Sequence, residues 1–276
     1  MPESDSGAAD LIRSQMVADY ESGAEPLTRQ CVGTALVMVG GIHPGMAVLD
    51  VAAGTGALSG AAAEAGARVL ATDISSAMLA RLSERLKPHP ECSVRVMDVR
   101  AIDLEEGAFD ATFSMFGALN LPDWHQGLCD LARVTRVGGH CCVSTWRDPR
   151  AVGAVPFLLD AWSATFPDFH VFPPEGPDVP RSPDVLRSGM TAAGFREVDV
   201  REVEVTWTSP SVETFLAERN QLYGFLPAYA ALDPHDRDRL VPALRDAALA
   251  ASRDRPLATA ATALVAVGQR PAGDAA

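Results

Sequence analysis

The segment that most constrains the fold of this chain is residues 48–59, which read VLDVAAGTGALS. Apolar residues 46–51 predict a short strand, two glycines predict a turn, and alanine-rich residues 57–65 predict a helix. A strand, a glycine turn and a helix in this order bring the backbone close to a nucleotide-like ligand. Gly54 and Gly56 lack a Cβ, so the turn can adopt positive φ and a ligand can contact the main chain.

Asp50 stands at the carboxyl end of the predicted first strand. The helix that follows the turn directs its free N–H groups and its positive end toward the same place. A carboxylate here disfavours a pyrophosphate and favours a cationic ligand, because like charges repel and unlike charges attract.

The next segments alternate between strands and helices. Strands are predicted over 68–74, 93–97, 111–115 and 141–146, with helices over 77–86 and 123–134 between them. Such alternation is typical of a doubly wound parallel sheet, whose ligands bind at the carboxyl ends of the strands. Asp73 ends the second predicted strand, where this fold places an acid that accepts hydrogen bonds from both hydroxyls of a ribose.

The run from Asp50 to Gly56, DVAAGTG, resembles the first motif of class I methyltransferases that use S-adenosylmethionine. That motif is an acidic residue, small residues and then Gly-x-Gly. The resemblance covers residues 44–146 and continues loosely to Phe195, and it is similar to the branch that includes the ubiquinone and menaquinone biosynthesis methyltransferases. Residues 133–139, RVTRVGG, resemble a second family signature, with Val137 where the family prefers proline.

The resemblance implies roles for further residues around the cofactor. Met78 would pack on the nucleoside, Asp98 would accept a hydrogen bond from the adenine amino group, and the N–H of Val99 would bind a ring nitrogen. Tyr20 would lie over the cofactor, although an anchor in the N-terminal helix explains it equally well. The expected residues for S-adenosylmethionine and its product S-adenosylhomocysteine are Tyr20, Asp50, Ala52, Ala53, Gly54, Gly56, Asp73, Ile74, Met78, Asp98, Val99, Ser114, Met115 and Phe116.

The acceptor is expected to be a small, partly apolar molecule, because the segment after the fifth strand is aromatic and poor in charge. The expected substrate contacts are Asn120, Trp146, Phe157, Phe169 and Tyr223. Methyl transfer requires the nucleophile, methyl group and sulfur to be held in line, and a base only when the nucleophile is a weakly acidic hydroxyl or carbon. The sequence identifies no base; His170 is a candidate by position, and a surface or core histidine is the alternative.

The resulting fold prediction is α/β, with a Rossmann-like, doubly wound, mostly parallel seven-stranded sheet, an antiparallel last strand, N-terminal helices and an inserted cap. The expected division is an N-terminal helical segment at 1–43, a cofactor-binding core at 44–147, a cap at 148–182, the rest of the core at 183–270 with a helical insertion at 212–252, and a tail at 271–276.

Net charge, apolar runs and cysteine spacing exclude several classes of function. A net charge of −13 disfavours nucleic acid as a partner, because phosphate backbones are repelled. There is no apolar run long enough to span a membrane and no secretory signal at the N-terminus, so a cytoplasmic protein is expected. The five cysteines lack metal-ligand spacing, no metal is expected, and Cys141 and Cys142 are expected in the core. The oligomeric state stays open.

Methyl transfer to oxygen, nitrogen or carbon of a small molecule, with secondary metabolism as one setting, is therefore the expected function. A protein that binds S-adenosylmethionine without transferring the methyl group is the alternative. An NAD-dependent oxidoreductase is disfavoured by Asp50 and by the lack of a Tyr-x-x-x-Lys sequence. Methylation of nucleic-acid bases is disfavoured by the acidity of the chain, and residues 120–123, NLPD, only weakly resemble the motif of those enzymes.

Overall fold

The computed structural model describes residues 4–172, 180–253 and 255–272, with side chains from residue 14 onward. Residues 273–276 of the predicted tail and part of the predicted cap lie outside these residues. Two compact units are present. The sheet unit comprises Thr28–Arg147, Pro177–Val203 and Thr262–Ala276, and the helical unit comprises Met1–Leu27, Asp148–Gly176 and Glu204–Ala261. These units combine segments that are distant in sequence, whereas the expected domains divide the chain at 43, 147 and 182.

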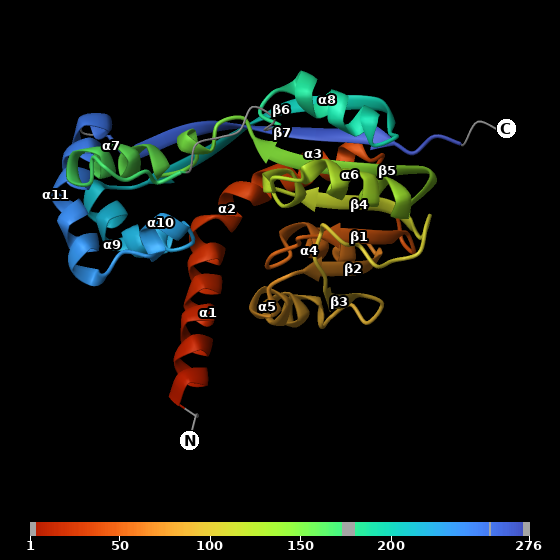
Figure 1. Ribbon diagram of the computed structural model, residues 1–276, viewed down its shortest axis with the longest axis horizontal. Helices are drawn as coiled ribbons and strands as arrows, with labels where there is room; N and C mark the ends of the chain where they lie inside the picture. The colour runs from red at the N-terminus through yellow and green to blue at the C-terminus, as the bar shows by residue number, and fades with distance from the viewer. Residues whose placement is uncertain (1–3, 173–179, 254, 273–276) are drawn as a thin grey trace. The chain divides into compact units, whose positions relative to one another are not determined.

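The elements follow the predicted order closely (Figure 1). The strands are β1 Ala47–Val51, β2 Arg68–Asp73, β3 Ser93–Val96, β4 Phe109–Met115, β5 Thr135–Trp146, β6 Arg196–Ser209 and β7 Leu257–Gln269. The α-helices are α1 Ser4–Gly23, α2 Glu25–Thr28, α3 Val32–Met38, α4 Ala57–Glu64, α5 Ser76–Leu86, α6 Trp124–Val134, α7 Val155–Thr165, α8 Pro183–Ala192, α9 Val212–Tyr223, α10 Pro227–Ala230 and α11 Pro234–Ser252. The 3-10 helices are η1 Arg29–Cys31, η2 Ala118–Asn120 and η3 Pro149–Ala151.

The seven strands form one sheet in the order β3-β2-β1-β4-β5-β7-β6. Strands β3, β2, β1, β4 and β5 pair in parallel, and β7 pairs antiparallel with β5. The predicted fold class is confirmed. Because parallel strands share a direction, the residues that follow β1, β2, β3, β4 and β5 meet at one edge of the sheet, called here the carboxyl edge.

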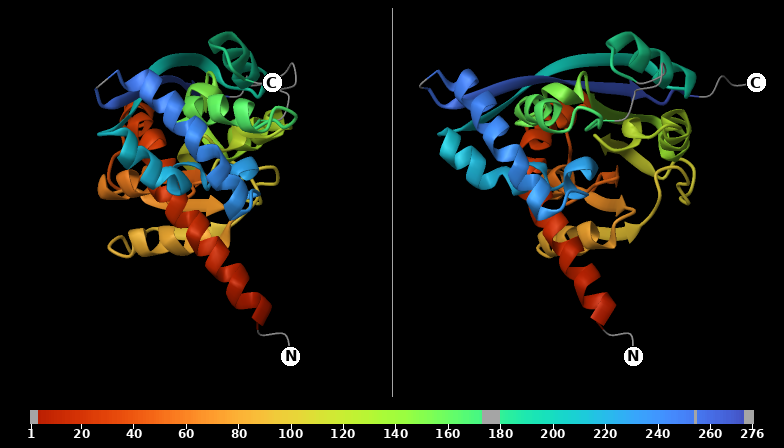
Figure 2. Two further views of the ribbon diagram at one scale, coloured as in Figure 1. Left: turned by 90° about the vertical axis from the view of Figure 1, so that its left-hand side faces the viewer. Right: turned by 60° about the vertical axis from the view of Figure 1, so that its left-hand side comes forward.

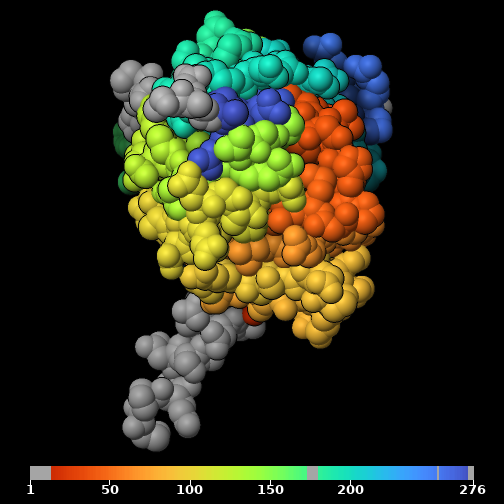
Figure 3. Space-filling view, turned by 90° about the vertical axis from the view of Figure 1, so that its right-hand side faces the viewer, coloured from red at the N-terminus to blue at the C-terminus, as the bar shows by residue number. Residues whose placement is uncertain are grey.

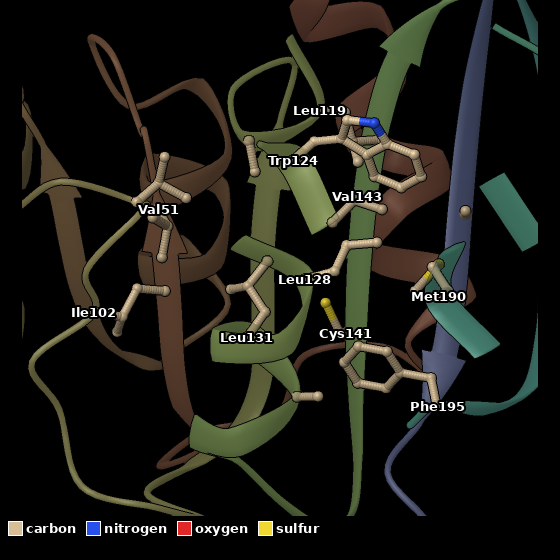
Figure 4. Close-up of a cluster of buried hydrophobic side chains, with 14 of the residues drawn as sticks. Val51, Ile102, Leu119, Trp124, Leu128, Leu131, Cys141, Val143, Met190 and Phe195 are labelled. Carbon is tan, nitrogen blue, oxygen red and sulfur yellow. The ribbon is translucent and has the colours of Figure 1, made fainter. Parts of the chain in front are cut away.

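Helices α6 and α8 cover one face of the sheet (Figure 4). Leu128 and Leu131 of α6 pack in one cluster with Val51 of β1 and Val143 of β5, and all four side chains are fully buried. The two helices approach closely because Gly189 of α8 has no side chain: a Cβ there would lie 2.4 Å from the Trp124 ring. Burial of such apolar side chains is the main stabilising contribution to this unit.

The opposite face of the sheet carries α3, α4 and α5. Successive side chains of a strand point to opposite faces. Leu49 and Val51 point toward α6, so Asp50 between them points toward α4, where Ser59 contacts it. Cys141 and Cys142 are fully buried with free thiols, as expected from the sequence.

The helices of the helical unit, drawn from two sides in Figure 2, have a core of their own. Helix α7 packs on α11 and α1 packs on α9. Phe157, Phe215, Tyr223 and Tyr229 are buried in one cluster between these helices. The Tyr223 hydroxyl satisfies its polar group by donating to the carbonyl of Ala154 at 2.8 Å.

Two local predictions were wrong. The fifth strand was expected to begin at Cys141, but β5 begins at Thr135, which pairs with Phe109 of β4. The glycines continue the strand, because Gly138 N–H donates to the Arg270 carbonyl at 2.7 Å and Arg270 N–H donates to the Gly139 carbonyl. The end of β7 therefore keeps the glycines of β5 within the sheet. This end of the sheet, opposite the carboxyl edge, faces the viewer in Figure 3. Asp123 was expected to cap the helix over 123–134; it directly precedes α6, but its side chain makes no capping hydrogen bond.

Candidate functional site

The glycine turn after β1 contains three residues with positive φ. Gly54 has φ 57° and Gly56 has φ 88°, values that glycine adopts without strain. A Cβ at position 56 would also lie 2.0 Å from Leu82 Cδ1, so Gly56 allows the start of α4 to approach α5. The third residue, Ala52, has φ 56°, a conformation that costs an alanine about 1–2 kcal/mol. Backbone strain of this kind is found mainly at functional sites.

The strain at Ala52 gives a stability prediction. We expect Ala52→Gly to raise the free energy of unfolding by about 0.5 kcal/mol, because relief of the left-handed conformation exceeds the entropy that glycine loses on folding. Ala53, which does not have positive φ, is the matched control: Ala53→Gly should lower the free energy of unfolding by about 0.5–1 kcal/mol. Urea denaturation of both variants measures the change in the free energy of unfolding. An equal decrease for Ala52→Gly and Ala53→Gly would show that the backbone at Ala52 is not strained.

Asp73 joins the glycine turn to the helix that follows β2. One carboxylate oxygen accepts from Gly54 N–H at 2.9 Å and the other accepts from Ser75 N–H at 2.8 Å. The Ser75 hydroxyl in turn caps α5 by accepting from Met78 N–H. A carboxylate offers about four lone-pair positions, so each Asp73 oxygen can accept a further hydrogen bond from a ligand hydroxyl.

Asp50 differs from its sequence-based expectation, because it is 1% exposed and does not present its charge at the surface. Its carboxylate accepts from the Ser59 hydroxyl at 2.6 Å and also receives a backbone hydrogen bond from Ser59. Burial, with a smaller contribution from the charge of Asp73, raises the pKa of Asp50 to about 7, although the bonds from Ser59 oppose the shift. Through these hydrogen bonds to Ser59, Asp50 holds the first turn of α4 against β1, next to the glycine turn.

The raised pKa of Asp50 predicts how stability depends on pH. The unfolded chain releases the Asp50 proton near pH 3.8, whereas the folded chain keeps it until about pH 7. The free energy of unfolding should therefore fall, relative to Asp50→Asn, as pH rises from about 4 to about 7, and level off above. Ser59→Ala removes a bond that lowers the pKa of Asp50, so it should extend the decline to higher pH. Parallel curves for the wild type and Asp50→Asn would contradict this assignment.

The expected adenine end lies after β2 and β3. Ile74 is 67% exposed beside Asp73, so its side chain is free to cover a flat ring, and Met78 is half-buried on the first turn of α5. Asp98 forms an ion pair with Arg100 at 2.6 Å, and the hydrogen bond from that guanidinium is the main reason that the pKa of Asp98 falls to about 2. An adenine amino group would therefore share Asp98 with Arg100. The side chain of Val99 is buried.

The segment after β4 brings Phe116 to the same edge. Phe116 has φ 58° and stacks on Trp146 at the end of β5, with ring centroids 4.4 Å apart. Gly117 follows, and a Cβ there would lie 2.4 Å from Ala52 Cβ, so the turns after β1 and β4 contact each other closely. Ser114 is fully buried, and its hydroxyl accepts from Ala118 N–H. The expected contact of Ser114 with the cofactor therefore stays a prediction; Met115 is half-buried.

The remaining expected residues belong to the helical unit. Phe157 and Tyr223 are buried in its core, which accounts for their apolar character without a substrate, and their expected contact with a substrate stays a prediction. Phe169 and His170 are exposed, and Tyr20 is half-buried in α1. The sheet unit thus brings together Asp50, Ala52, Ala53, Gly54, Gly56, Asp73, Ile74, Met78, Asp98, Val99, Met115, Phe116, Asn120 and Trp146.

Three residues of the site were not found from the sequence. Ser59 holds Asp50, Arg100 pairs with Asp98, and Arg181 donates to the Trp146 carbonyl at 2.9 Å. Ser59 could have been found, since it stands on the third residue of the helix that faces the strand bearing Asp50. Arg181 carries no local signal, because it is distant in sequence from its partners.

A hollow of about 400 Å³ lies at the end of the parallel strands opposite the carboxyl edge. It is lined by Glu106, Cys129, Arg133 and Arg270 among others. Both arginines already donate to backbone carbonyls and carboxylates, so nothing in the hollow indicates a ligand. In the described part of the chain, no helix has the length and apolarity to cross a membrane and no group of potential metal ligands occurs.

Comparison with known proteins agrees with this geometry. Residues 48–139 match a family model described as a methyltransferase domain. The chain is 34% identical over 169 residues to an uncharacterised protein of Mycobacterium tuberculosis, which covers 60% of this chain and 61% of that protein. It is 32% identical over 170 residues to the malonyl-[acyl-carrier protein] O-methyltransferase of Serratia marcescens, covering 59% and 64%. The matches therefore span about three fifths of these relatives.

Solved structures show the same fold. A phosphoethanolamine N-methyltransferase of Haemonchus contortus, solved with phosphomonomethylethanolamine and S-adenosylhomocysteine, superposes with a TM-score of 0.53. Its sequence identity is 18%, and the match covers 87% of this chain and 52% of that one. The strand order and the solved structures show the fold, and the segment that carries the glycine turn lies within the residues that match the methyltransferase domain model.

Proposed function

We propose that this protein transfers the methyl group of S-adenosylmethionine to a small, partly apolar acceptor. The observation that carries the proposal is the position of Asp73, whose two oxygens join the glycine turn to α5 and keep lone pairs for a vicinal diol. Asp98, at the end of the neighbouring β3, supports an adenine at the next position along the same edge. The relatives whose names describe methyl transfer support the same reading.

The cofactor supplies an activated methyl group on a positively charged sulfur, so the protein has to bind and orient rather than activate. The main-chain atoms of Ala52, Ala53 and Gly54 would line the cofactor, because the turn exposes backbone where side chains are absent or small. Asp73 and Asp98 would hold the nucleoside. Phe116 and Trp146, stacked at the ends of β4 and β5, would form an apolar wall at the acceptor end.

The proposal assigns no general base. His170 is exposed on the helical unit, and His125, on the first turn of α6 after β4, is exposed and stacks on Trp124. An acceptor whose nucleophile is already ionised or neutral and basic, such as a carboxylate or an amine, needs no base. The net charge of −13 supports a small molecule over a nucleic acid, and a cytoplasmic setting belongs to the same proposal.

Methyl transfer can be tested with S-adenosylmethionine labelled on its methyl group and three acceptor classes: carboxylic acids and their thioester-linked forms, quinols and phenols, and amines. We expect S-adenosylhomocysteine to accumulate with one class, and label to enter the acceptor. Asp73→Ala should lower the rate several-fold at a cofactor concentration that nearly saturates the wild type, because its weaker binding leaves most of the variant without cofactor. Tight binding of the cofactor with no transfer to any class would favour the alternative, a binding protein without methyl transfer.

A further inference from the structure

The backbone of Phe116 is held from both sides. Its N–H donates to the carbonyl and to the hydroxyl of Ser144, at 3.1 Å each. Its carbonyl accepts from the Asn120 side-chain amide at 2.7 Å. Phe116 has φ 58°, a conformation that an aromatic residue rarely adopts without support from its surroundings. The hydrogen bonds to Ser144 and Asn120 provide that support.

The bond from Asn120 is the last of a series that begins at Arg181. Arg181 Nη1 donates to Thr145 Oγ1 at 3.1 Å and to the Trp146 carbonyl at 2.9 Å. Thr145 Oγ1 then donates to Asn120 Oδ1 at 3.4 Å. Thr145 is fully buried, so its hydroxyl depends on protein partners, and Arg181 and Asn120 occupy its acceptor and donor capacities.

This series reaches the backbone of both residues of the aromatic pair. One end holds the Trp146 carbonyl, the other holds the Phe116 carbonyl, and the two rings stack with an interplanar angle of 29°. Hydrogen bonds in a chain polarise one another, so a charged donor at its head strengthens the bonds that follow.

We infer that Arg181, Thr145 and Asn120 act as positioning residues, forming a hydrogen-bond relay that keeps Phe116 in its left-handed conformation and its ring against Trp146. The hydrogen bonds of the relay are inferred from the geometry of the sheet unit alone. Its role beside the methyl acceptor rests on the proposed function. Gly117 follows Phe116 and lies close to Ala52. By holding Phe116, the relay therefore also holds the turn after β4 against the glycine turn after β1.

The test uses protein labelled with 5-fluorotryptophan and fluorine NMR, with Trp146→Phe to assign the Trp146 resonance. Asn120→Ala and Arg181→Met should each shift or broaden that resonance, because the ring pair loses its fixed geometry. Trp124, Trp162 and Trp207 report on folding in the same spectrum and should keep their positions. Arg181→Lys keeps a charged donor and should restore the wild-type resonance, a rescue that loss of general packing would not show.

Calorimetric titration with S-adenosylmethionine separates the relay from the proposed function. We expect Asn120→Ala to weaken binding about fivefold, in line with loss of one ordinary hydrogen bond. A Trp146 resonance that neither Asn120→Ala nor Arg181→Met changes, with the other resonances in place, overturns the relay. A wild type that binds no S-adenosylmethionine, while its Trp146 resonance responds to both substitutions, leaves the relay supported and refutes the proposed function.

Discussion

Replacement of Asp73 by alanine is expected to weaken binding of S-adenosylmethionine by about 2–3 kcal/mol, a loss of roughly 30- to 150-fold in affinity. Two charge-assisted hydrogen bonds to the ribose would be lost, and such bonds are about twice as strong as neutral ones. The substitution also removes the hydrogen bonds that the carboxylate accepts from the N–H groups of Gly54 and Ser75. Isothermal titration calorimetry with S-adenosylmethionine measures the change in affinity.

Two controls separate ligand contacts from local structure. Asp73→Asn keeps a carbonyl oxygen for one backbone N–H but lacks the charge, so its affinity should lie between those of the wild type and Asp73→Ala. Asp199→Ala removes an exposed carboxylate that pairs with Arg201 away from the site and should leave affinity unchanged. If Asp73→Ala binds as tightly as the wild type, Asp73 does not contact the cofactor.

The second large effect is expected at Gly56. Gly56→Ala should lower the free energy of unfolding by about 2–4 kcal/mol, because the alanine would adopt φ 88° and its Cβ would lie 2.0 Å from Leu82 Cδ1. Leu82 is fully buried, so its side chain has little space into which it can turn. Urea denaturation monitored by circular dichroism measures the loss.

Gly60 in the same helix provides the matched control. A Cβ there would lie 3.4 Å from Arg85 Cδ, which is an ordinary contact, and the residue is in a helical conformation. Gly60→Ala should therefore raise the free energy of unfolding by about 0.5–1 kcal/mol. Combining Gly56→Ala with Leu82→Ala should recover part of the steric cost but not the conformational cost. Equal effects of the two glycine substitutions would show that the turn is not constrained.

Local patterns were sufficient to predict the fold. The glycine turn, the alternation of strands with helices and the strand-terminal acids Asp73 and Asp98 all depend on neighbours in sequence, and the observed elements agree with them to within a few residues. The start of β5 was missed because it depends on pairing with Phe109 of β4 and on bonds to Arg270, which lies 132 residues from Gly138 in sequence. Long-range pairing of this kind leaves no local pattern.

The site was predicted less completely than the fold, for two physical reasons. The type of a residue does not determine whether its side chain is buried. Aromatic residues such as Phe157 and Tyr223 can pack in a core or line a pocket, and here they pack in a core. Asp50 is charged in type but is buried against Ser59. Partners from distant segments are also invisible, as with Arg181 and Thr145. The alternation of β1 could have placed Asp50 on the face away from α6, because both of its neighbours are apolar.

The central claim is that the carboxyl edge of the sheet unit binds S-adenosylmethionine. Calorimetric titration of the wild type with S-adenosylmethionine, S-adenosylhomocysteine and NAD tests it most directly. The account predicts binding of the first two in the micromolar range, about −8 kcal/mol, and no binding of NAD. Binding of NAD alone would contradict the assignment of Asp73 and Asp98, and binding of none of the three would contradict the assignment of this edge as a cofactor site.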